Sequence, residues 1–210
     1  MSQPFSEITR RHVASRCAAF PRLPANDTTS GLKRAAVAIA LVEADGAAGG
    51  AALLLTLRAA GLRAHSNQWA LPGGRCDAGE TPTAAALREL DEEIGLKLEP
   101  EDALGILDDY ATRSGYLITP VVLWAANSSN LLLNPDEVAS VHRIALPNVM
   151  GADAFDFIAI PESERRVIRY RHHGDFIHAP TAALMYQFRE VLAGRHTRVA
   201  ELEQPVFAWK

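Results

Sequence analysis

The sequence predicts an α/β (α+β) fold in which a mixed β-sheet is sandwiched between helices. Short apolar runs with strand character recur along the chain, two segments have a clear helical period, and both of those helices have residues that mark their ends. Strands interleaved with helices favour a sheet that is covered on both faces. With 48% hydrophobic and 22% charged residues, the chain has the composition of an ordinary globular protein.

The more informative helix is expected to begin at Thr81 and to end before Gly95. A threonine hydroxyl can accept a hydrogen bond from an unpaired amide at a helix start, and Pro82 suits the first turn. Glycine can adopt the left-handed conformation that closes a helix. At about 100° per residue, one apolar stripe is expected to pack on the core. This stripe consists of Ala84, Leu87, Leu90 and Ile94.

The opposite face of this helix is expected to carry three glutamates, at positions 89, 92 and 93. Carboxylates this close repel one another unless a positive charge lies among them, and carboxylate oxygens are the ligands that Mg²⁺ prefers. Ala85 and Ala86 beside this face would leave room for a ligand. The alternative is that the acidic face is simply solvated.

The spacing of residues 74–96 is more specific than the glutamates alone. It fits the pattern G-x5-E-x7-R-E-U-x-E-E-x-G-U, where U is a bulky aliphatic residue, and so resembles the box of the Nudix hydrolase family. The fixed positions are filled by Gly74, Glu80, Arg88, Glu89, Leu90, Glu92, Glu93, Gly95 and Leu96. The resemblance implies the Nudix fold and hydrolysis of a nucleoside diphosphate linked to another group.

The same resemblance implies a divalent cofactor, Mg²⁺ or Mn²⁺, and roles for particular residues. The metal ligands would be the carbonyl of Gly73 and the carboxylates of Glu89, Glu92 and Glu93. Glu89 would be either a further ligand or the catalytic base. Arg88 would orient Glu89 through a charge-assisted hydrogen bond, and Glu80 would be structural.

A later loop offers a second candidate for the base. Members of the family take the base from the box or from a loop further along, and Glu137, in the run Asn134 to Val138, is the best acid downstream. The alternative is that Glu137 is a solvated loop carboxylate, because acidic side chains in loops usually face water.

The segment before the box narrows the substrate class. It resembles the pattern L-L-T-x-R-x-x-x-L-R-x-H-x-G-Q of the coenzyme A pyrophosphatase branch. The matching residues are Leu54, Leu55, Thr56, Arg58, Leu62, Arg63, His65 and Gln68, whereas Ser66 and Asn67 replace the x-G pair and Leu71 replaces a phenylalanine. Arg58 and Arg63, with His65 nearby, would bind phosphates such as that of the 3′-phosphoadenosine end. The alternative is that both arginines are surface cations.

These resemblances predict hydrolysis of coenzyme A or acyl-coenzyme A to 4′-phosphopantetheine, or its acyl form, and adenosine 3′,5′-bisphosphate. The same chemistry on ADP-ribose, NADH or a dinucleoside polyphosphate is the alternative. A third reading is a nucleotide-sensing module without catalysis, which the complete set of box carboxylates disfavours.

The remaining chain is predicted to form one domain with appendages. Residues 1–31 would be a helix and linker, 32–194 the Nudix domain, and 195–210 a tail. The N-terminal helix, residues 5–19, would bury Phe5, Ile8, Val13 and Phe20. Strands are expected at 35–42, 52–58, 68–71, 103–109, 116–124, 138–146, 167–171 and 175–178, with a turn or short helix at 147–155 and a helix at 181–192.

Charge and cysteine content limit the partners that we expect. The net charge of −4 gives no electrostatic reason for binding nucleic acid or an anionic membrane, so an anionic small-molecule substrate needs local cations and metal. Cys17 and Cys76 fit no disulfide framework or zinc pattern, which favours free thiols in the cytoplasm. The apolar tail end is a candidate contact for a homodimer.

Overall fold

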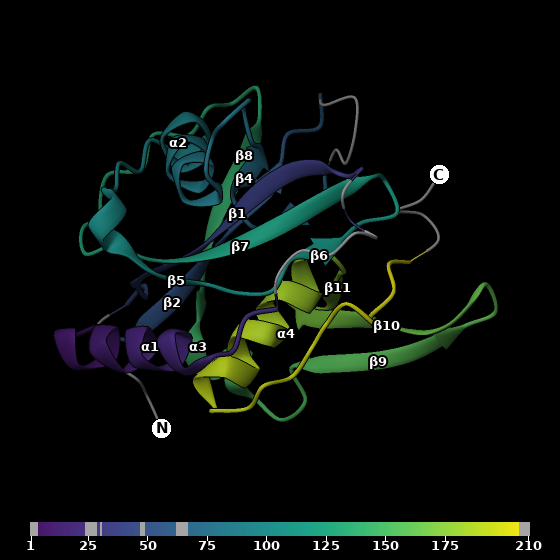
Figure 1. Ribbon diagram of the computed structural model, residues 1–210. Helices are drawn as coiled ribbons and strands as arrows, with labels where there is room; N and C mark the ends of the chain where they lie inside the picture. The colour runs from purple at the N-terminus through teal and green to yellow at the C-terminus, as the bar shows by residue number, and fades with distance from the viewer. Residues whose placement is uncertain (1–3, 24–28, 30, 47–48, 62–66, 206–210) are drawn as a thin grey trace.

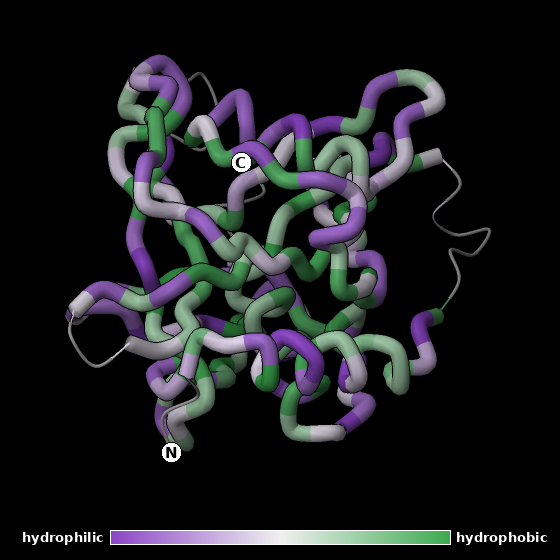
Figure 2. Tube along the Cα trace, turned by 90° about the vertical axis from the view of Figure 1, so that its left-hand side faces the viewer, coloured by the Kyte–Doolittle hydropathy of each residue, from purple (hydrophilic) through white to green (hydrophobic). Residues whose placement is uncertain are grey.

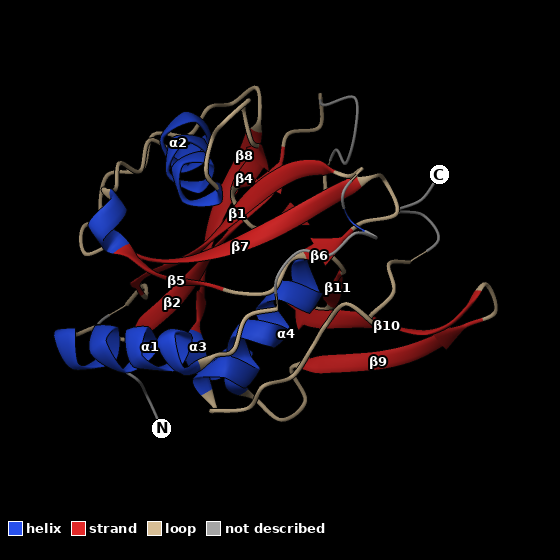
Figure 3. Ribbon diagram, viewed as in Figure 1, coloured by secondary structure: helices blue, strands red, loops and turns tan. Residues whose placement is uncertain are grey.

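The computed structural model of the protein describes residues 4–23, 29, 31–46, 49–61 and 67–205. It confirms the predicted fold class, because a mixed sheet lies between helix α2 on one face and helices α1 and α4 on the other (Figures 1 and 3). The helices are α1 (Glu7–Ala19), α2 (Pro82–Ile94), α3 (Leu146–Met150), α4 (Thr181–Leu192) and the 3-10 helix η2 (Pro100–Asp102). The strands are β1 (Lys33–Glu43), β2 (Ala51–Arg58), β3 (Trp69–Ala70), β4 (Gly73–Arg75), β5 (Ala103–Ile106), β6 (Tyr110–Ala111), β7 (Tyr116–Trp124), β8 (Val138–Ala145), β9 (Phe155–Ile160), β10 (Ser163–His172) and β11 (Asp175–His178).

The main sheet opens where the site lies. Strands β1 and β2 pair only from Leu41 to Glu43, next to their connecting turn. Further along, β4 pairs with β1 and β3 pairs with β2, so these two short strands fill the gap between the diverging partners. The glycine pair Gly73 and Gly74 of β4 is thereby held against the middle of the sheet. On its other edge β1 runs parallel to β7.

The two faces of the sheet bury different kinds of side chain. Toward α2, strand β1 presents Ala36, Ala38 and Ala40, which pack with Ala85 and Ala86 of the helix. Toward α1 and α4, the alternate residues of the same strand belong to a core of larger side chains. Small residues on both sides of a contact let a helix approach a sheet closely. Figure 2 shows hydrophobic segments running through the middle of the trace and hydrophilic ones gathered on outer turns.

Helix α2 has the predicted ends but a different buried face. The Thr81 hydroxyl accepts the Ala84 N–H at 3.2 Å, and Gly95 closes the helix with φ of 67°. The predicted stripe is wrong at Ala84, which is exposed, and the predicted polar face is wrong at Glu93, which is 2% exposed. The cause is that Ala85 and Ala86 contact the sheet rather than leaving room for a ligand. This turns the helix so that Glu93 lies beside the buried Leu90 and Ile94.

The N-terminal helix packs on the body of the protein. Helix α1 contacts β5 and α4, and the ring of Phe5 stacks on Trp124 with centroids 4.2 Å apart. The expectation that Ile8 is buried is wrong, since its side chain is 73% exposed. The buried side of the helix instead follows an i, i+4 spacing through Thr9, Val13 and Cys17. The predicted boundaries at residues 31 and 194 remain predictions.

The C-terminal part of the chain forms a second sheet that the sequence indicated only in part. The predicted turn or short helix at 147–155 contains α3, whereas β9 was not predicted and β10 begins earlier than expected. The first residues of β10 are charged and exposed, because the hairpin of β9 and β10 projects from the body (Figure 1). The strand was therefore not recognised from its sequence there. The predicted strands at 167–171 and 175–178 lie in an antiparallel hairpin, with left-handed turn residues His173 and Gly174. No helix in the described ranges is long and apolar enough to span a membrane.

Candidate active site

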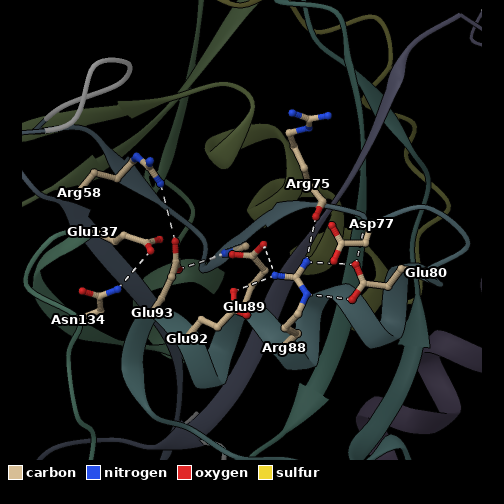
Figure 4. A network of polar contacts seen from close by, with 11 residues as sticks. Arg58, Arg75, Asp77, Glu80, Arg88, Glu89, Glu92, Glu93, Asn134 and Glu137 are labelled. Atoms are coloured by element: carbon tan, nitrogen blue, oxygen red, sulfur yellow. Dashed lines mark hydrogen bonds and ion pairs between the residues drawn. The ribbon is translucent and has the colours of Figure 1, made fainter.

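Arg88 is the centre of a hydrogen-bond network on α2 (Figure 4). Its Nε and Nη2 atoms donate to the two carboxylate oxygens of Glu80 at 3.0 and 3.1 Å. Its Nη1 atom donates to Glu89 at 2.9 Å and to Glu92 at 2.8 Å, and Nη2 also donates to the carbonyl of Arg75. The hydrogen bonds to these carboxylates raise the pKa of Arg88, and the bond from Arg88 lowers the pKa of Glu80. Arg88 therefore fixes the orientation of three carboxylates at once.

Glu93 lies at the junction of α2 and β4. Its Oε2 atom accepts the Gly73 N–H at 3.2 Å, and its Oε1 atom is 3.8 Å from Nη1 of Arg58. Burial, followed by the nearby charge of Glu89, raises the pKa of Glu93 to about 8. Burial likewise raises the pKa of Glu89, although Arg88 opposes this. The two carboxylates thus lack enough positive charge around them to be ionised without cost.

The oxygen atoms at this site are of the kind that bind a hard divalent cation. Carboxylate oxygens of Glu89, Glu92 and Glu93 and the carbonyl of Gly73 are oxygen ligands of the kind that Mg²⁺ and Mn²⁺ accept. Within the described part of the chain, no three acidic, histidine or cysteine side chains converge into a ready-made metal cage. An open arrangement suits Mg²⁺, which usually keeps water and substrate phosphates in its shell. Raised carboxylate pKa values at a buried site are the second indication, because a bound cation would favour the ionised form.

The loop before β8 brings Glu137 to the same region. The amide Nδ2 of Asn134 donates to Glu137 Oε1 at 3.2 Å, while the backbone N–H of Asn134 donates to the carbonyl of Glu93 at 2.9 Å. The loop is therefore tied to the end of α2. Glu137 is half-buried rather than fully solvated, and its charge contributes to the raised pKa of Glu93. Both candidates for the base, Glu89 and Glu137, thus lie near Glu93.

A cavity of about 640 Å³ opens beside the carboxylates, between the main sheet and the β11–α4 segment. Gly73, Gly74 and Arg58 form its edge toward α2. Its walls include the aromatic side chains of Trp69, Tyr116 and Phe176. The volume is in the range of small-molecule sites, which are lined mostly by apolar and aromatic groups with a few polar ones.

Arg58 joins the two parts of this site. It lines the cavity while its guanidinium approaches Glu93, and its Nε atom is buried without a hydrogen-bond partner among the described residues. Buried donors are nearly always paired, so this atom is one that a bound ligand could satisfy. The other predicted cations, Arg63 and His65, lie outside the described residues.

The cavity contains residues that the sequence analysis did not single out. Trp69 follows the matched Gln68 directly, so the pattern before the box was a usable signal for it. Phe176 and Gln204 lie far along the chain, and only the folded structure brings them beside β4. His172 pairs with Asp175 next to the hairpin turn and is buried against Trp69, with ring centroids 4.6 Å apart. Burial and the neighbouring His173 and His142 lower its pKa to about 4.

Oriented carboxylates next to a ligand-sized cavity with a cation at its edge define a class of protein, the metal-dependent hydrolases of phosphate linkages. Comparison with known proteins identifies the family. The NUDIX domain model matches residues 32–162, which is more than half of the chain. The chain belongs to the Nudix family and is a Nudix hydrolase of nucleoside diphosphate linkages, a group that generally uses divalent metals.

Individual relatives agree with this assignment. The chain is 32% identical over 141 residues to the protein described as uncharacterized Nudix hydrolase NudL of Photorhabdus laumondii, covering 66% of this chain and 75% of that one. It is 38% identical over 118 residues to Nudix hydrolase 3 of Caenorhabditis elegans, covering 54% and 48%. Among solved structures, the Nudix hydrolase RenU of M. smegmatis is 26% identical with a TM-score of 0.50, covering 78% and 87%.

Proposed function

We propose that the protein hydrolyses the diphosphate linkage of coenzyme A or acyl-coenzyme A, releasing 4′-phosphopantetheine, or its acyl form, and adenosine 3′,5′-bisphosphate. The observation that carries the proposal is the position of Arg58 between the α2 carboxylates and the cavity. A diphosphate bound there would satisfy the buried, unpartnered Nε atom. The group attached to the diphosphate would then extend into the cavity.

The backbone at Asn67 supports the coenzyme A branch. This residue stands where the branch pattern has glycine, and its φ of 55° lies in the left-handed region. Asparagine tolerates this conformation better than most residues other than glycine. Asparagine at this position is therefore compatible with a left-handed conformation of the kind that glycine adopts easily.

In the proposed site, the carbonyl of Gly73 and the carboxylates of Glu89, Glu92 and Glu93 would hold Mg²⁺ or Mn²⁺. The bound cation would neutralise charge that develops on the phosphate oxygens during hydrolysis. Arg88 orients the carboxylates of Glu89 and Glu92 by donating to both. Arg58 would bind the diphosphate and hold it in line for attack.

A carboxylate would take the proton from the attacking water. The water oxygen then bonds to one phosphorus, the bond from that phosphorus to the bridging oxygen breaks, and the other phosphate leaves with the bridging oxygen. Glu89 and Glu137 are both candidates, because both lie near Glu93 and each has one oxygen held by a donor. We expect the Gln variant of the true base to lose about 10²-fold or more in kcat, as general bases typically contribute that much.

The same site could serve another nucleoside diphosphate. The aromatic walls formed by Trp69, Tyr116 and Phe176 would also accommodate a nucleobase. ADP-ribose, NADH and dinucleoside polyphosphates are therefore the alternative substrates.

Products released from each substrate would test the proposal. The protein is incubated with Mg²⁺ or Mn²⁺ and, separately, with coenzyme A, acetyl-coenzyme A, ADP-ribose, NADH and diadenosine tetraphosphate, and the products are separated by chromatography. We expect adenosine 3′,5′-bisphosphate from the two coenzyme A substrates at a kcat/KM well above that of the others. Preferential cleavage of any other substrate would overturn the coenzyme A assignment.

Where the protein acts and whether it assembles remain predictions. Cys17 and Cys76 are free thiols, which supports a reducing compartment, and we propose the cytoplasm. A homodimer formed through the apolar tail end also remains a prediction, because Val206 to Trp209 lie outside the described residues. Sedimentation of the full chain would measure the oligomeric state.

A further inference from the structure

The segment after α4 returns to the main sheet and reaches the cavity. The backbone N–H of Glu203 donates to the carbonyl of Arg166 at 2.8 Å, and Glu203 forms a parallel bridge with Val167. The hydroxyl of Tyr110 donates to the carbonyl of Leu202 at 2.8 Å. This part of the tail is therefore attached to both sheets.

An ion pair between the buried carboxylate of Glu203 and the partly exposed Arg113 fixes the end of this segment. Glu203 is 3% exposed, and its carboxylate accepts from Arg113 Nη2 at 2.6 Å and from the Ser163 hydroxyl at 3.0 Å. It also accepts the backbone N–H of Gln204 at 3.0 Å. The position of Gln204 is thus set by a carboxylate that has partners on β10 and on the β6–β7 turn.

The side chain of Gln204 lines the cavity and carries a hydrogen-bond donor whose orientation is restricted by Arg113. It is 4% exposed and lines the cavity close to Thr112 and Ser114. Its Oε1 atom accepts the backbone N–H of Arg113 at 2.7 Å. Because a backbone N–H can only donate, the oxygen must face Arg113 and the amide nitrogen must point elsewhere. Among the described residues, the hydrogen bonds of Gln204 involve its Oε1 atom and its backbone N–H, and none involves that nitrogen.

We propose that Gln204 is a specificity-determining residue, whose amide nitrogen donates a hydrogen bond to an uncharged acceptor on the group attached to the diphosphate. The inference rests on the proposed function only in placing that group in the cavity. A neutral carboxamide among apolar walls discriminates in favour of a carbonyl oxygen or ring nitrogen, since an analogue without an acceptor leaves the donor unpaired. Both halves of coenzyme A carry such acceptors, namely the amides of the pantetheine arm and the nitrogens of adenine.

Two variants with opposite side effects test this role. Gln204→Glu keeps an oxygen for the Arg113 N–H but removes the donor and adds a negative charge. Gln204→Met removes the donor without adding charge but also removes the oxygen that accepts the Arg113 N–H. Glu201→Gln is the matched control, because Glu201 is an exposed residue of the same segment. Thermal unfolding of each variant, measured without substrate, shows whether the fold is retained.

Steady-state kinetics are measured with every diphosphate that the wild-type protein cleaves. We expect both Gln204 variants to raise KM by about tenfold, with a smaller change in kcat, while Glu201→Gln behaves as wild type. If KM rises for coenzyme A alone, the acceptor lies on the pantetheine arm. If KM rises equally for ADP-ribose, the acceptor lies on the adenosine that both substrates share. An increase for Gln204→Glu alone would indicate charge repulsion and would overturn the inference, as would unchanged KM values.

The outcomes separate this inference from the proposed function. If the wild-type protein cleaves a diphosphate other than coenzyme A and both Gln204 variants raise its KM, the coenzyme A assignment fails while the role of Gln204 stands. If coenzyme A is cleaved with the same KM by all variants, the role of Gln204 fails alone. No turnover of any diphosphate by the wild-type protein would overturn both.

Discussion

Gly74 and Glu89 face each other across the junction between β4 and α2. A Cβ atom added to Gly74 would lie 2.5 Å from the carboxylate carbon of Glu89, nearer than non-bonded atoms can approach. A side chain at the first position of the box would therefore collide with Glu89, which explains why this position is glycine. Glycine lets the carboxylate lie directly against the backbone of the strand.

Gly74→Ala is expected to displace Glu89 and to lower kcat by about 10-fold to 10²-fold, because small displacements of catalytic groups have large effects. Gly61→Ala is the matched control, since a Cβ there meets nothing within 4 Å. Steady-state kinetics with saturating Mg²⁺ would measure the difference. Equal activity of the two variants would show that Glu89 does not need its present position.

Glu93→Gln is expected to remove metal-dependent activity while stabilising the metal-free protein at alkaline pH. The pKa of Glu93 is raised from 4.5 to about 8, so ionisation of this group opposes folding. Its contribution is therefore most favourable below pH 4.5 and is lost progressively as the pH rises to about 8. Glutamine can still accept the Gly73 N–H and carries no charge.

Thermal unfolding at pH 5 and pH 9, in EDTA and in excess Mg²⁺, would measure this effect. We expect the metal-free variant to have the higher midpoint at pH 9, and wild type to gain more from Mg²⁺ than the variant does. A variant that binds Mg²⁺ as wild type does, or that retains near wild-type turnover, would contradict the assignment of Glu93 as a metal ligand.

Arg88→Lys is expected to lower both stability and kcat although the charge is kept. A lysine has one nitrogen and cannot donate to Glu80, Glu89 and Glu92 in the geometry of the guanidinium. We expect a loss of about 1–3 kcal/mol in the free energy of unfolding, as for other hydrogen bonds to charged groups. Urea denaturation and kinetics on the same preparation would measure both losses. Loss of stability with unchanged kcat would mean that Arg88 supports the fold and does not position Glu89.

Glu203 is expected to make the attachment of the tail sensitive to acid. Although burial opposes it, the hydrogen bonds from Arg113, Gln204 and Ser163 lower the pKa of Glu203 below 4.5. Its stabilising effect is therefore complete above pH 4.5 and is lost as the pH falls through the lower value in the folded protein. Glu203→Gln should cost about 1 kcal/mol at pH 7, since the arginine is partly exposed to solvent.

Thermal unfolding of wild type and Glu203→Gln from pH 7 to pH 3 would measure this dependence. The difference between the two proteins should shrink as the pH falls. A constant difference over this range would show that ionisation of Glu203 does not contribute to stability.

Local signals in the sequence were sufficient for the helix that carries the carboxylates. Thr81, Pro82 and Gly95 act within one turn of the helix ends, so their effects do not depend on the rest of the fold. The burial of Glu93 could not be predicted in this way. It depends on how closely α2 approaches β1, which is set by side chains more than 40 positions earlier in the chain.

The residues that line the cavity could not be predicted from local sequence signals. Its walls combine residues from β3, β7, β11 and the tail, and no periodicity links Trp69 to Phe176 or Gln204. Of the two arginines predicted to bind phosphate, Arg58 lies beside Glu93, whereas Arg63 is outside the described residues, so their role stays a prediction. The ribbon of β9 and β10 was missed for a different reason. The first half of β10 is charged and exposed and lacks the apolar alternation that indicates a half-buried strand.

The alanines between β1 and α2 bring the helix that carries the carboxylates close to the sheet. Ala36, Ala38 and Ala40 pack against the face of α2 opposite Glu89 and Glu92, and their small size lets the helix lie close to the sheet. Adding methyl groups to this contact would push the helix outward, because packed interiors cannot absorb extra volume without movement. If the carboxylates of α2 hold a metal as proposed, such substitutions are expected to weaken metal binding, although they lie on the buried side of the helix.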